Sequence, residues 1–167
     1  MTGSARRFGV LLVTALAACA PADPAHEHEV AVRVERVGLD ADDLPIVLLE
    51  ETGGPRWLAI WIGIAEAQSI ALSIESFASP RPNSHDLARS VIDGLRGKVE
   101  RVVVTDVREG TYYATLALRA GDRRVEIDAR PSDAIAIALR AHAPIFVRDH
   151  LLERDDRPAE RAAGPSI

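Results

Sequence analysis

The segment around Pro131 concentrates side chains that can bind anions and move protons. Asp128, Arg130, Ser132 and Asp133 all lie within six residues of one another. Pro131 has a fixed φ and disfavours the helical conformation of the preceding residue, so we expect a strand to end and a helix to begin here. Ser132 or Asp133 is expected to cap that helix. Because helix N-termini attract anions and the planar guanidinium suits phosphate, we predict that Arg130 and Ser132 bind substrate.

A second group of the same kind lies upstream in the chain. Arg81, His85 and Asp86 stand just before or inside the first turn of another predicted helix. Histidine can act as a general acid or base near neutral pH, and Arg81 is expected to hold a substrate phosphate together with Arg130. If the two corners meet in space, we predict a phosphodiester hydrolase with His85, Asp86 and Asp133 as catalytic residues.

The carboxylates of both corners also suit a metal ion. Asp86 and Asp128 offer oxygen ligands of the type that Mg²⁺ or Mn²⁺ prefers in proteins. We therefore expect these two residues to be the metal ligands if the reaction uses a metal, and we expect no other cofactor.

Each of these residues also has a structural interpretation, which the sequence leaves open. Asp133 is a good helix cap. Arg130 paired with Asp86 or Asp128 would be an ion pair that locks the two corners together. His85 can equally be a buried, hydrogen-bonded residue at a helix start.

The elements that must position these side chains are strands and helices in separate blocks. Hydrophobic periodicity and turn residues predict strands at Val30–Val34, Leu44–Leu49, Trp57–Gly63, Val99–Val107, Thr111–Leu118, Arg124–Asp128 and Pro144–Val147. The same criteria predict helices at Ala65–Ser76, Asp86–Leu95 and Asp133–Ala141. Segregated strands and helices predict an α+β fold, a mainly antiparallel sheet with helices packed on it.

One of these helices and one of these strands carry more specific predictions. The helix that carries Asp86 is expected to begin with Asn83 or Ser84 as N-cap and to have an apolar stripe of Leu87, Val91 and Leu95. Trp57 and Trp61 share one strand face, and we expect cross-strand packing rather than a binding surface from them.

The N-terminus is typical of an export signal. Arg6 and Arg7 precede an apolar run that ends at Ala18 and is too short to span a bilayer. Cys19, the one cysteine of the chain, follows directly, and the pattern resembles a bacterial lipoprotein signal. We predict a signal peptide at residues 1–18, lipidation of Cys19, a flexible linker at 19–29, a domain at 30–153 and a disordered tail at 154–167. The chain is then anchored to a membrane outside the cytoplasm, in the periplasm or at the cell surface.

The charge of the chain argues against a broad grip on nucleic acid. The 20 basic and 25 acidic residues give a formal charge of -5. Removal of residues 1–18 leaves 18 basic residues and a charge of -7. Because nucleic-acid affinity depends on neutralising phosphates, any phosphate site on this chain must be local.

Three segments taken together resemble one known family. They are Pro80-Arg81-Pro82-Asn83-Ser84-His85-Asp86-Leu87, Gly110-Thr111-Tyr112-Tyr113-Ala114 and Asp128-Ala129-Arg130-Pro131-Ser132-Asp133-Ala134-Ile135-Ala136. In this order they resemble the bifunctional nuclease domain, with support from Ile60-Trp61-Ile62-Gly63 with Glu66-Ala67 and from Pro144-Ile145-Phe146-Val147. The resemblance implies a compact α+β domain, a homodimer, and activity on RNA and DNA.

The resulting hypothesis is a nuclease that hydrolyses phosphodiester bonds of RNA or DNA and is tethered outside the cytoplasm. The alternative is a non-catalytic module that binds a nucleotide or a protein on the same fold. The acidic charge favours the alternative, whereas the complete motifs around His85 and Arg130 favour the nuclease.

Overall fold

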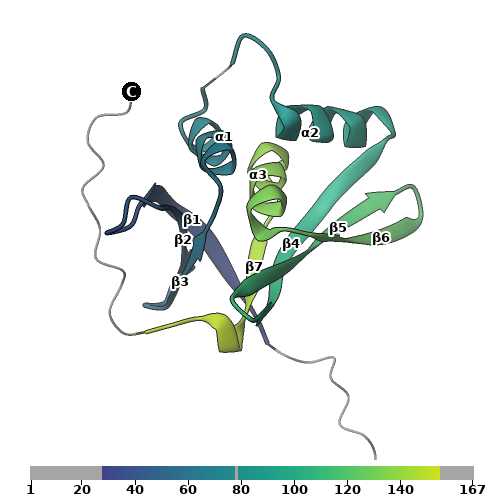
Figure 1. Cartoon of the computed structure of the whole chain (residues 1–167). Coiled ribbons are helices and arrows are strands. Elements are labelled where there is room, and N and C mark those ends of the chain that lie inside the picture. The colour runs from purple at the N-terminus through teal and green to yellow at the C-terminus, as the bar shows by residue number, and fades with distance from the viewer. Residues whose placement is uncertain (1–27, 78, 155–167) are drawn as a thin grey trace, which may run out of the picture.

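The computed structural model describes residues 28–77 and 79–154, and in this part of the chain one sheet carries three helices (Figure 1). The strands are β1 Glu29–Leu39, β2 Pro45–Glu51, β3 Trp57–Trp61, β4 Gly97–Arg108, β5 Thr111–Ala120, β6 Arg123–Ala129 and β7 Ile145–Arg148. The helices are α1 Ile64–Ile74, α2 Ser84–Gly94 and α3 Pro131–Ala141, and a short 3-10 helix, η2 Asp149–Leu151, follows β7. The predicted α+β fold is confirmed. The predictions for the signal peptide, Cys19, the linker and the tail fall outside the described residues, except at residues 28, 29 and 154.

The sheet has seven strands in the order β3-β2-β1-β7-β4-β5-β6. All neighbouring strands run antiparallel except β4 and β7, which are parallel. The β4–β5 hairpin closes at Glu109 and Gly110, whose φ values are 49° and 76°. Two consecutive positive φ values are those of a type I′ turn, which matches the twist of the flanking strands.

The main core lies between one face of the sheet and the helices. Figure 1 shows α3 between α1 and α2 on that side of the sheet. Fully buried side chains of α3, such as Ile135, pack against Val102 and Val104 of β4 and against Ile70 of α1. The helix starts are therefore held at fixed positions over the sheet, which is the condition for a precise site.

The two tryptophans of β3 differ in their surroundings. Trp57 is buried with Leu48 and Ala59 in a second, smaller cluster. Trp61 is 53% exposed, and its indole Nε1 donates a hydrogen bond to Asp40 at 2.7 Å. The expected packing role is therefore confirmed for Trp57 and is wrong for Trp61.

The apolar stripe of α2 lies in solvent. Leu87, Val91 and Leu95 are exposed, and no residue of α2 is buried. Ile92, on a different side of the helix, is the residue that packs against the core. The stripe is therefore an exposed surface. None of the helices formed by residues 28–77 and 79–154 is both long and apolar enough to cross a bilayer.

Candidate active site between three helix starts

The two corners of the sequence meet in one open cavity. His85 Nε2, in the first turn of α2, lies 3.1 Å from Asp133 Oδ1, in the first turn of α3. The start of α1 contributes Glu66 and Ser69 to the same cavity, which has a volume of about 380 Å³ and also contains Arg130. The structure thus brings together His85, Arg130 and Asp133 of the predicted site residues.

Helix α2 begins where it does because of Asn83. The Asn83 side chain accepts hydrogen bonds from the backbone N–H groups of His85 and Asp86 at 2.9 and 3.0 Å. Asp86 Oδ2 in turn accepts the backbone N–H of Asn83 at 2.8 Å, which completes a capping box. This arrangement satisfies otherwise free helix donors and fixes His85 in the first turn.

Helix α3 begins differently from the expectation. Its first residue is Pro131, its N-cap is Arg130, and no side chain caps it. The prediction that Ser132 or Asp133 caps this helix is wrong, because Pro131 at the first helical position moves both residues inside the helix. Asp133 instead accepts hydrogen bonds from His85 and Arg130.

The ring of His85 is held in one orientation at both nitrogens. Its Nδ1 lies 2.8 Å from Ser69 Oγ, opposite the contact of Nε2 with Asp133. The same Oγ accepts hydrogen bonds from Asn83 Nδ2 and from Arg140 Nη2, both at 3.0 Å. With both lone pairs of the hydroxyl used, its proton points to Nδ1. The neutral ring therefore carries its proton on Nε2 and donates it to Asp133.

The contacts of Ser69, His85 and Asp133 do not form a serine hydrolase triad. In such a triad the serine approaches Nε2 and the aspartate Nδ1, which is the reverse of this arrangement. Ser69 is also only 4% exposed. Its hydroxyl is therefore a hydrogen-bond partner of the histidine and not a nucleophile.

Arg130 joins the acidic residues of the cavity. Its Nε and Nη2 bind Asp133 at 2.7 and 3.0 Å, and Nη2 also binds Glu66 at 2.6 Å. Within the described chain its Nη1 has no hydrogen-bond partner, and the side chain is 65% exposed. One edge of the guanidinium is therefore available to a ligand.

These contacts shift the titration of the acidic groups. Burial raises the pKa of Asp133, but the hydrogen bonds from Arg130 and His85 outweigh it and leave that pKa below its ordinary value. The pKa of Glu66 is lowered by its own backbone N–H and by Arg130. The pKa of Arg130 is raised by Asp133 and Glu66. Both carboxylates are thus ionised at neutral pH.

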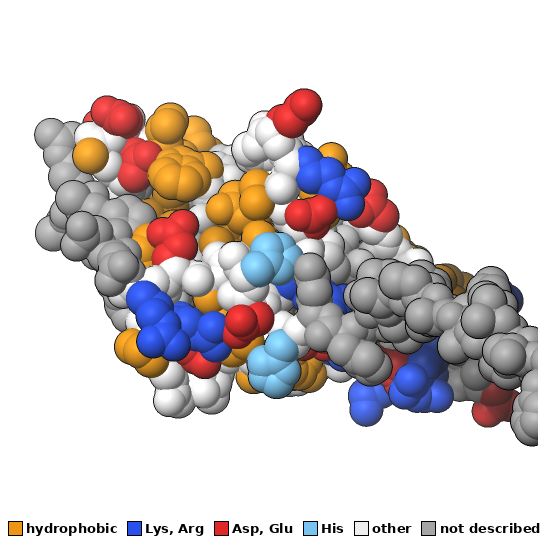
Figure 2. Space-filling model, turned by 90° about the horizontal axis from the view of Figure 1, so that it is seen from below, with side chains coloured by type: hydrophobic (Ala, Val, Ile, Leu, Met, Phe, Trp, Pro, Cys, Tyr) orange, Lys and Arg blue, Asp and Glu red, His pale blue; other side chains and the backbone are white. Residues whose placement is uncertain are grey.

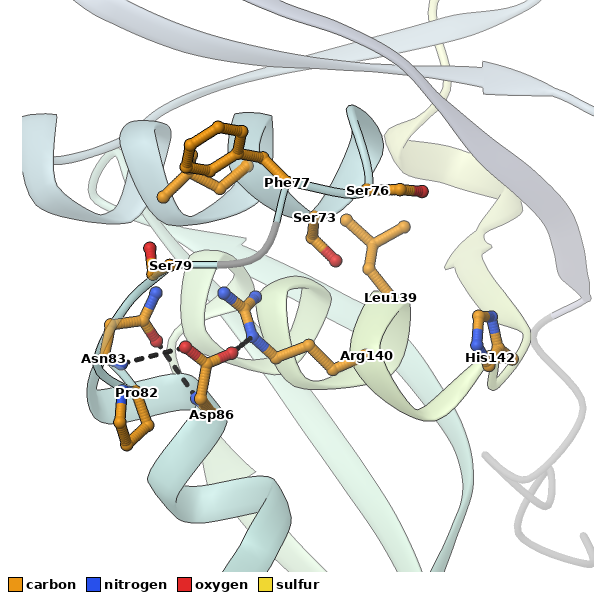
Figure 3. Close-up of a pocket in the computed structure, with 11 residues that line it drawn as sticks. Ser73, Ser76, Phe77, Ser79, Pro82, Asn83, Asp86, Leu139, Arg140 and His142 are labelled. Carbon is orange, nitrogen blue, oxygen red and sulfur yellow. Dashed lines mark hydrogen bonds and ion pairs between the residues drawn. The ribbon is translucent and has the colours of Figure 1, made fainter.

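Asp86 lines a neighbouring cavity and not the one that contains His85. Its Oδ1 accepts a hydrogen bond from Arg140 Nε at 2.5 Å, as the dashed line in Figure 3 shows. Arg140 and then the backbone N–H of Asn83 lower the pKa of Asp86. The ion-pair partner of Asp86 is thus Arg140, where the sequence suggested Arg130. Both oxygens of Asp86 are engaged, so the geometry fits a structural role.

The remaining predicted residues lie apart from His85. Asp128 is paired with Thr115 in the β5–β6 register, one residue from Ala129, which packs against the core. Because side chains alternate along a strand, Asp128 points to the opposite face of the sheet. Arg81 is exposed in the loop before α2, and Ser132 is buried beside a separate cavity.

The predicted metal ligands do not fit a metal ion. Asp86 is held by Arg140 and Asn83, whereas Asp128 faces away across the sheet. Nowhere in residues 28–77 and 79–154 do three His, Cys, Asp or Glu side chains gather as a metal site would require.

Sequence reasoning missed three residues of the network, Glu66, Ser69 and Arg140. Glu66 and Ser69 are three positions apart on α1, and Arg140 follows Asp133 by seven positions on α3. Both spacings put residues on one helix face. This helical periodicity could have placed Glu66 with Ser69, and Arg140 with Asp133, on one helix face each. It does not show which faces of α1 and α3 lie against His85.

Charges are mixed on the face of the molecule that Figure 2 draws. Figure 2 shows basic, acidic and histidine side chains interspersed with hydrophobic ones on the face that it draws. The net charge of -5 agrees with this pattern. A surface of mixed charge offers a polyanion no continuous positive patch, so individual donors such as the exposed Nη1 of Arg130 are the groups that could hold an anion.

Comparisons with known proteins agree on one family. The family model described as the bifunctional nuclease domain matches residues 47–160. An uncharacterised protein of Mycobacterium tuberculosis is 43% identical over 123 residues, which is 74% of this chain and 71% of that protein. Bifunctional nuclease 2 of Arabidopsis thaliana is 34% identical over 66% of this chain, and bifunctional nuclease 1 of indica rice 29% identical over 69%. The matched regions span 34% and 36% of the two plant proteins.

Proposed function

We propose that this chain, which belongs to the bifunctional nuclease domain family, hydrolyses phosphodiester bonds of RNA or DNA in the cavity between the starts of α1, α2 and α3. The observation that carries the proposal is the convergence of His85, Asp133 and Arg130 in that open cavity. Asp133 supplies a proton acceptor, His85 supplies a hydrogen-bond donor in a fixed orientation, and Arg130 supplies a guanidinium that can bind a phosphate.

Arg130 is the phosphate-binding group in this proposal. Its free Nη1 edge faces solvent, while its other edge is held by Asp133 and Glu66. The N–H groups of Nη1 can donate charge-assisted hydrogen bonds to a phosphate oxygen while the rest of the guanidinium stays held. Arg81, exposed in the nearby loop, adds a second, sequence-independent contact to the substrate backbone.

Asp133 is the general base. At rest its pKa is kept low by Arg130 and His85. A bound phosphate brings negative charge close to Asp133, and this raises the pKa of Asp133 towards the value that suits a base. Asp133 then accepts a proton from the attacking water, while a solvent water protonates the leaving oxygen.

His85 is the stabilising donor. Ser69 fixes the tautomer with the proton on Nε2. When Asp133 turns to the water, that N–H becomes free to donate to the phosphate oxygens, on which negative charge increases in the transition state. Donors already oriented for that charge are among the largest contributions to catalysis.

Asp86 and Asp128 do not offer a divalent cation a shared site. The roles proposed for Arg130, Asp133 and His85 therefore do not depend on a cation held by those two residues. Dependence on Mg²⁺ or Mn²⁺ stays a prediction that the assay tests. The purified chain is incubated with single-stranded RNA and single-stranded DNA in Mg²⁺, Mn²⁺ or EDTA. We expect cleavage products from at least one polymer, and their complete absence under every condition would defeat the proposal.

A second candidate function is a non-catalytic module that binds a nucleotide or a protein. Both ring nitrogens of His85 are engaged and the chain is acidic, and these observations favour it. In the same assay this candidate predicts binding of the polymer without products.

We also propose that the domain acts outside the cytoplasm, on a membrane anchor at Cys19. The support is the sequence of residues 1–19 alone, an n-region with Arg6 and Arg7 followed by an apolar run. In the host, the chain should incorporate a radiolabelled lipid precursor and sediment with membranes. Cys19→Ser should abolish both, and unchanged membrane association of that variant would refute the anchor.

We further propose that the chain forms a homodimer. The exposed stripe of Leu87, Val91 and Leu95 on α2 supports it, because apolar side chains gathered on one helix face favour association. Light scattering should give twice the mass of one chain, and Val91→Glu should reduce it to one. A monomeric wild type would remove this part of the proposal.

A further inference from the structure

A second cavity shares Arg130 with the cavity of the candidate active site. It has a volume of about 370 Å³, and Arg130 lines both this cavity and the one that contains His85. Its walls come from the end of β3 and the residues that follow, the β4–β5 turn, and the start of α3. Three of the segments that carry the family resemblance thus meet at this cavity, at Ile60–Gly63, Gly110–Tyr112 and Arg130–Ser132. Of the residues that line it, the proposed reaction uses only Arg130.

The start of α3 leaves donors without partners at this cavity. Pro131 has no N–H, and the first backbone bond of the helix runs from Ala134 N to Arg130 O at 3.1 Å. The N–H groups of Ser132 and Asp133 therefore receive no cap. Such N–H groups point outward from the helix and carry the positive end of its dipole.

The starts of the other two helices are already occupied. Asn83 and Asp86 cap α2 through their side chains. The carboxylate of Glu66 binds its own backbone N–H in the first turn of α1, and a Cβ at Gly63 would lie only 2.2 Å from a carboxylate oxygen of Glu66. Of the three helices, α2 alone has a side-chain cap, and at α1 the carboxylate of Glu66 lies close to the backbone of the helix start.

Ser132 gives a second, independent indication of a ligand. The residue is only 6% exposed and lines the cavity. Its hydroxyl has no hydrogen-bond partner among residues 28–77 and 79–154, yet it is not one of the polar atoms sealed from solvent. Polar side chains this deeply placed are normally paired. The unpaired hydroxyl, the uncapped N–H groups and the Nη1 of Arg130 together form a set of donors that have no acceptor in the described chain.

We propose that this cavity binds a phosphate group of the substrate that is adjacent to the phosphate being cleaved. The inference rests on the proposed nuclease function and extends it to the substrate's neighbouring nucleotide. A strand that crosses Arg130 can place one phosphate beside His85 and Asp133 and the next beside Ser132, because Arg130 lines both cavities. Backbone N–H groups, a hydroxyl and a guanidinium are the donors that bind phosphate at helix starts.

Thr111 allows a test with a matched control. It is exposed at the start of β5 and lines the cavity, so substitutions there leave the core intact. Thr111→Glu brings a negative charge to the donors, whereas Thr111→Gln has nearly the same size without the charge. Ser132→Ala removes the unpaired hydroxyl.

The kinetic test compares dinucleotides that carry no terminal phosphate, a 5′-phosphate or a 3′-phosphate. One of the two terminal phosphates should lower KM by about tenfold with little change in kcat, the size expected for hydrogen bonds to a charged group. Thr111→Glu and Ser132→Ala should remove this advantage, and Thr111→Gln should keep it. Thr111→Glu and Thr111→Gln should still cleave the dinucleotide without a terminal phosphate. No advantage for either phosphate, or one that survives Thr111→Glu, overturns the proposal.

A binding test does not depend on catalysis. By calorimetry on the whole chain, thymidine 3′,5′-bisphosphate should bind about tenfold more tightly than thymidine 5′-monophosphate or inorganic phosphate. Thr111→Glu should remove the difference. If inorganic phosphate binds as tightly as the bisphosphate, the adjacent-phosphate assignment is wrong. If the chain cleaves nothing but shows the expected binding pattern, the nuclease proposal falls and the phosphate site stands. If the chain cleaves the polymers but shows neither the KM advantage nor the tighter binding of the bisphosphate, the phosphate site falls and the nuclease proposal stands.

Discussion

The Nε2 atom of His85 lies 3.1 Å from Oδ1 of Asp133, although 48 positions separate the two residues. The contact exists because α2 and α3 both begin at the same cavity and the capping box of Asn83 fixes the first of them. The imidazole comes from one helix start and the carboxylate from the other, so neither helix alone makes this contact. The chemistry proposed for this chain therefore depends on tertiary structure, and it can be tested residue by residue.

Asp133→Asn should lower kcat/KM for RNA or DNA by about 100-fold or more, because the amide cannot accept the proton of the attacking water. The amide oxygen can still accept hydrogen bonds from His85 Nε2 and Arg130 Nη2, but the bond from Arg130 Nε is lost, so stability should fall and the activities are compared below the thermal midpoint of the variant. Asp93→Asn is the matched control, since Asp93 pairs with Arg89 on the exposed side of α2. Equal activities of Asp133→Asn and wild type would remove Asp133 from the mechanism.

Ser69→Ala should release the tautomer of His85. In the wild type, ¹⁵N NMR of the imidazole should show the proton on Nε2, and the variant should show a mixture of both tautomers. The variant should also lose about 1–3 kcal/mol of stability, because donors of Asn83 and Arg140 are left unpaired. Ser90→Ala, on the exposed surface of α2, should change neither quantity. A wild-type ring protonated on Nδ1 would show that the network is oriented differently.

The Asp86–Arg140 pair should make stability depend on acid. Hydrogen bonding by Arg140 lowers the pKa of Asp86 in the folded state below its ordinary value of 3.8. The stabilisation is then fully present above the unfolded pKa and is lost as the pH falls through the folded pKa. In urea titrations, Asp86→Asn should be less stable than the wild type near pH 7, and the difference should shrink below pH 3.8. A difference that stays constant with pH would be inconsistent with this assignment.

Arg81→Ala should weaken the electrostatic contact with the substrate and leave the chemistry intact. We expect a higher KM, an unchanged kcat, and a slope of log KM against log salt that is smaller by about one phosphate contact. Arg33→Ala is a suitable control, because Arg33 pairs with Glu50 on β1 and β2, outside the cavity. If both variants have the same salt dependence as wild type, Arg81 does not touch the substrate backbone.

Local signals in the sequence predicted much of the fold. Glu109-Gly110 between two β-branched or alternating runs predicted the β4–β5 hairpin, and Asn83 predicted the start of α2. These features depend on neighbouring residues alone. The insertion of β7 between β1 and β4, parallel to β4, could not be predicted in this way, because it depends on which distant strands pair.

The candidate site was predictable only in part, for the same reason. The residue types of His85, Arg130 and Asp133 and their positions at helix starts were sufficient to single them out. The partner of Asp86 did not follow, because Arg140 becomes its neighbour only when α3 packs between α1 and α2. Asp128 appeared suitable because it is close to Arg130 along the chain. Alternation along β6 nevertheless turns its side chain to the other face of the sheet.

The most direct test of the central claim is cleavage by the double variant His85→Ala/Arg130→Ala. Its single-turnover rate on single-stranded RNA and DNA is compared with that of wild type at equal protein concentration, after circular dichroism has shown that the variant is folded. The account predicts a loss of at least about 1,000-fold, since a phosphate-binding guanidinium and an oriented donor are removed together. A double variant that cleaves as fast as wild type would contradict the assignment of this cavity as the active site.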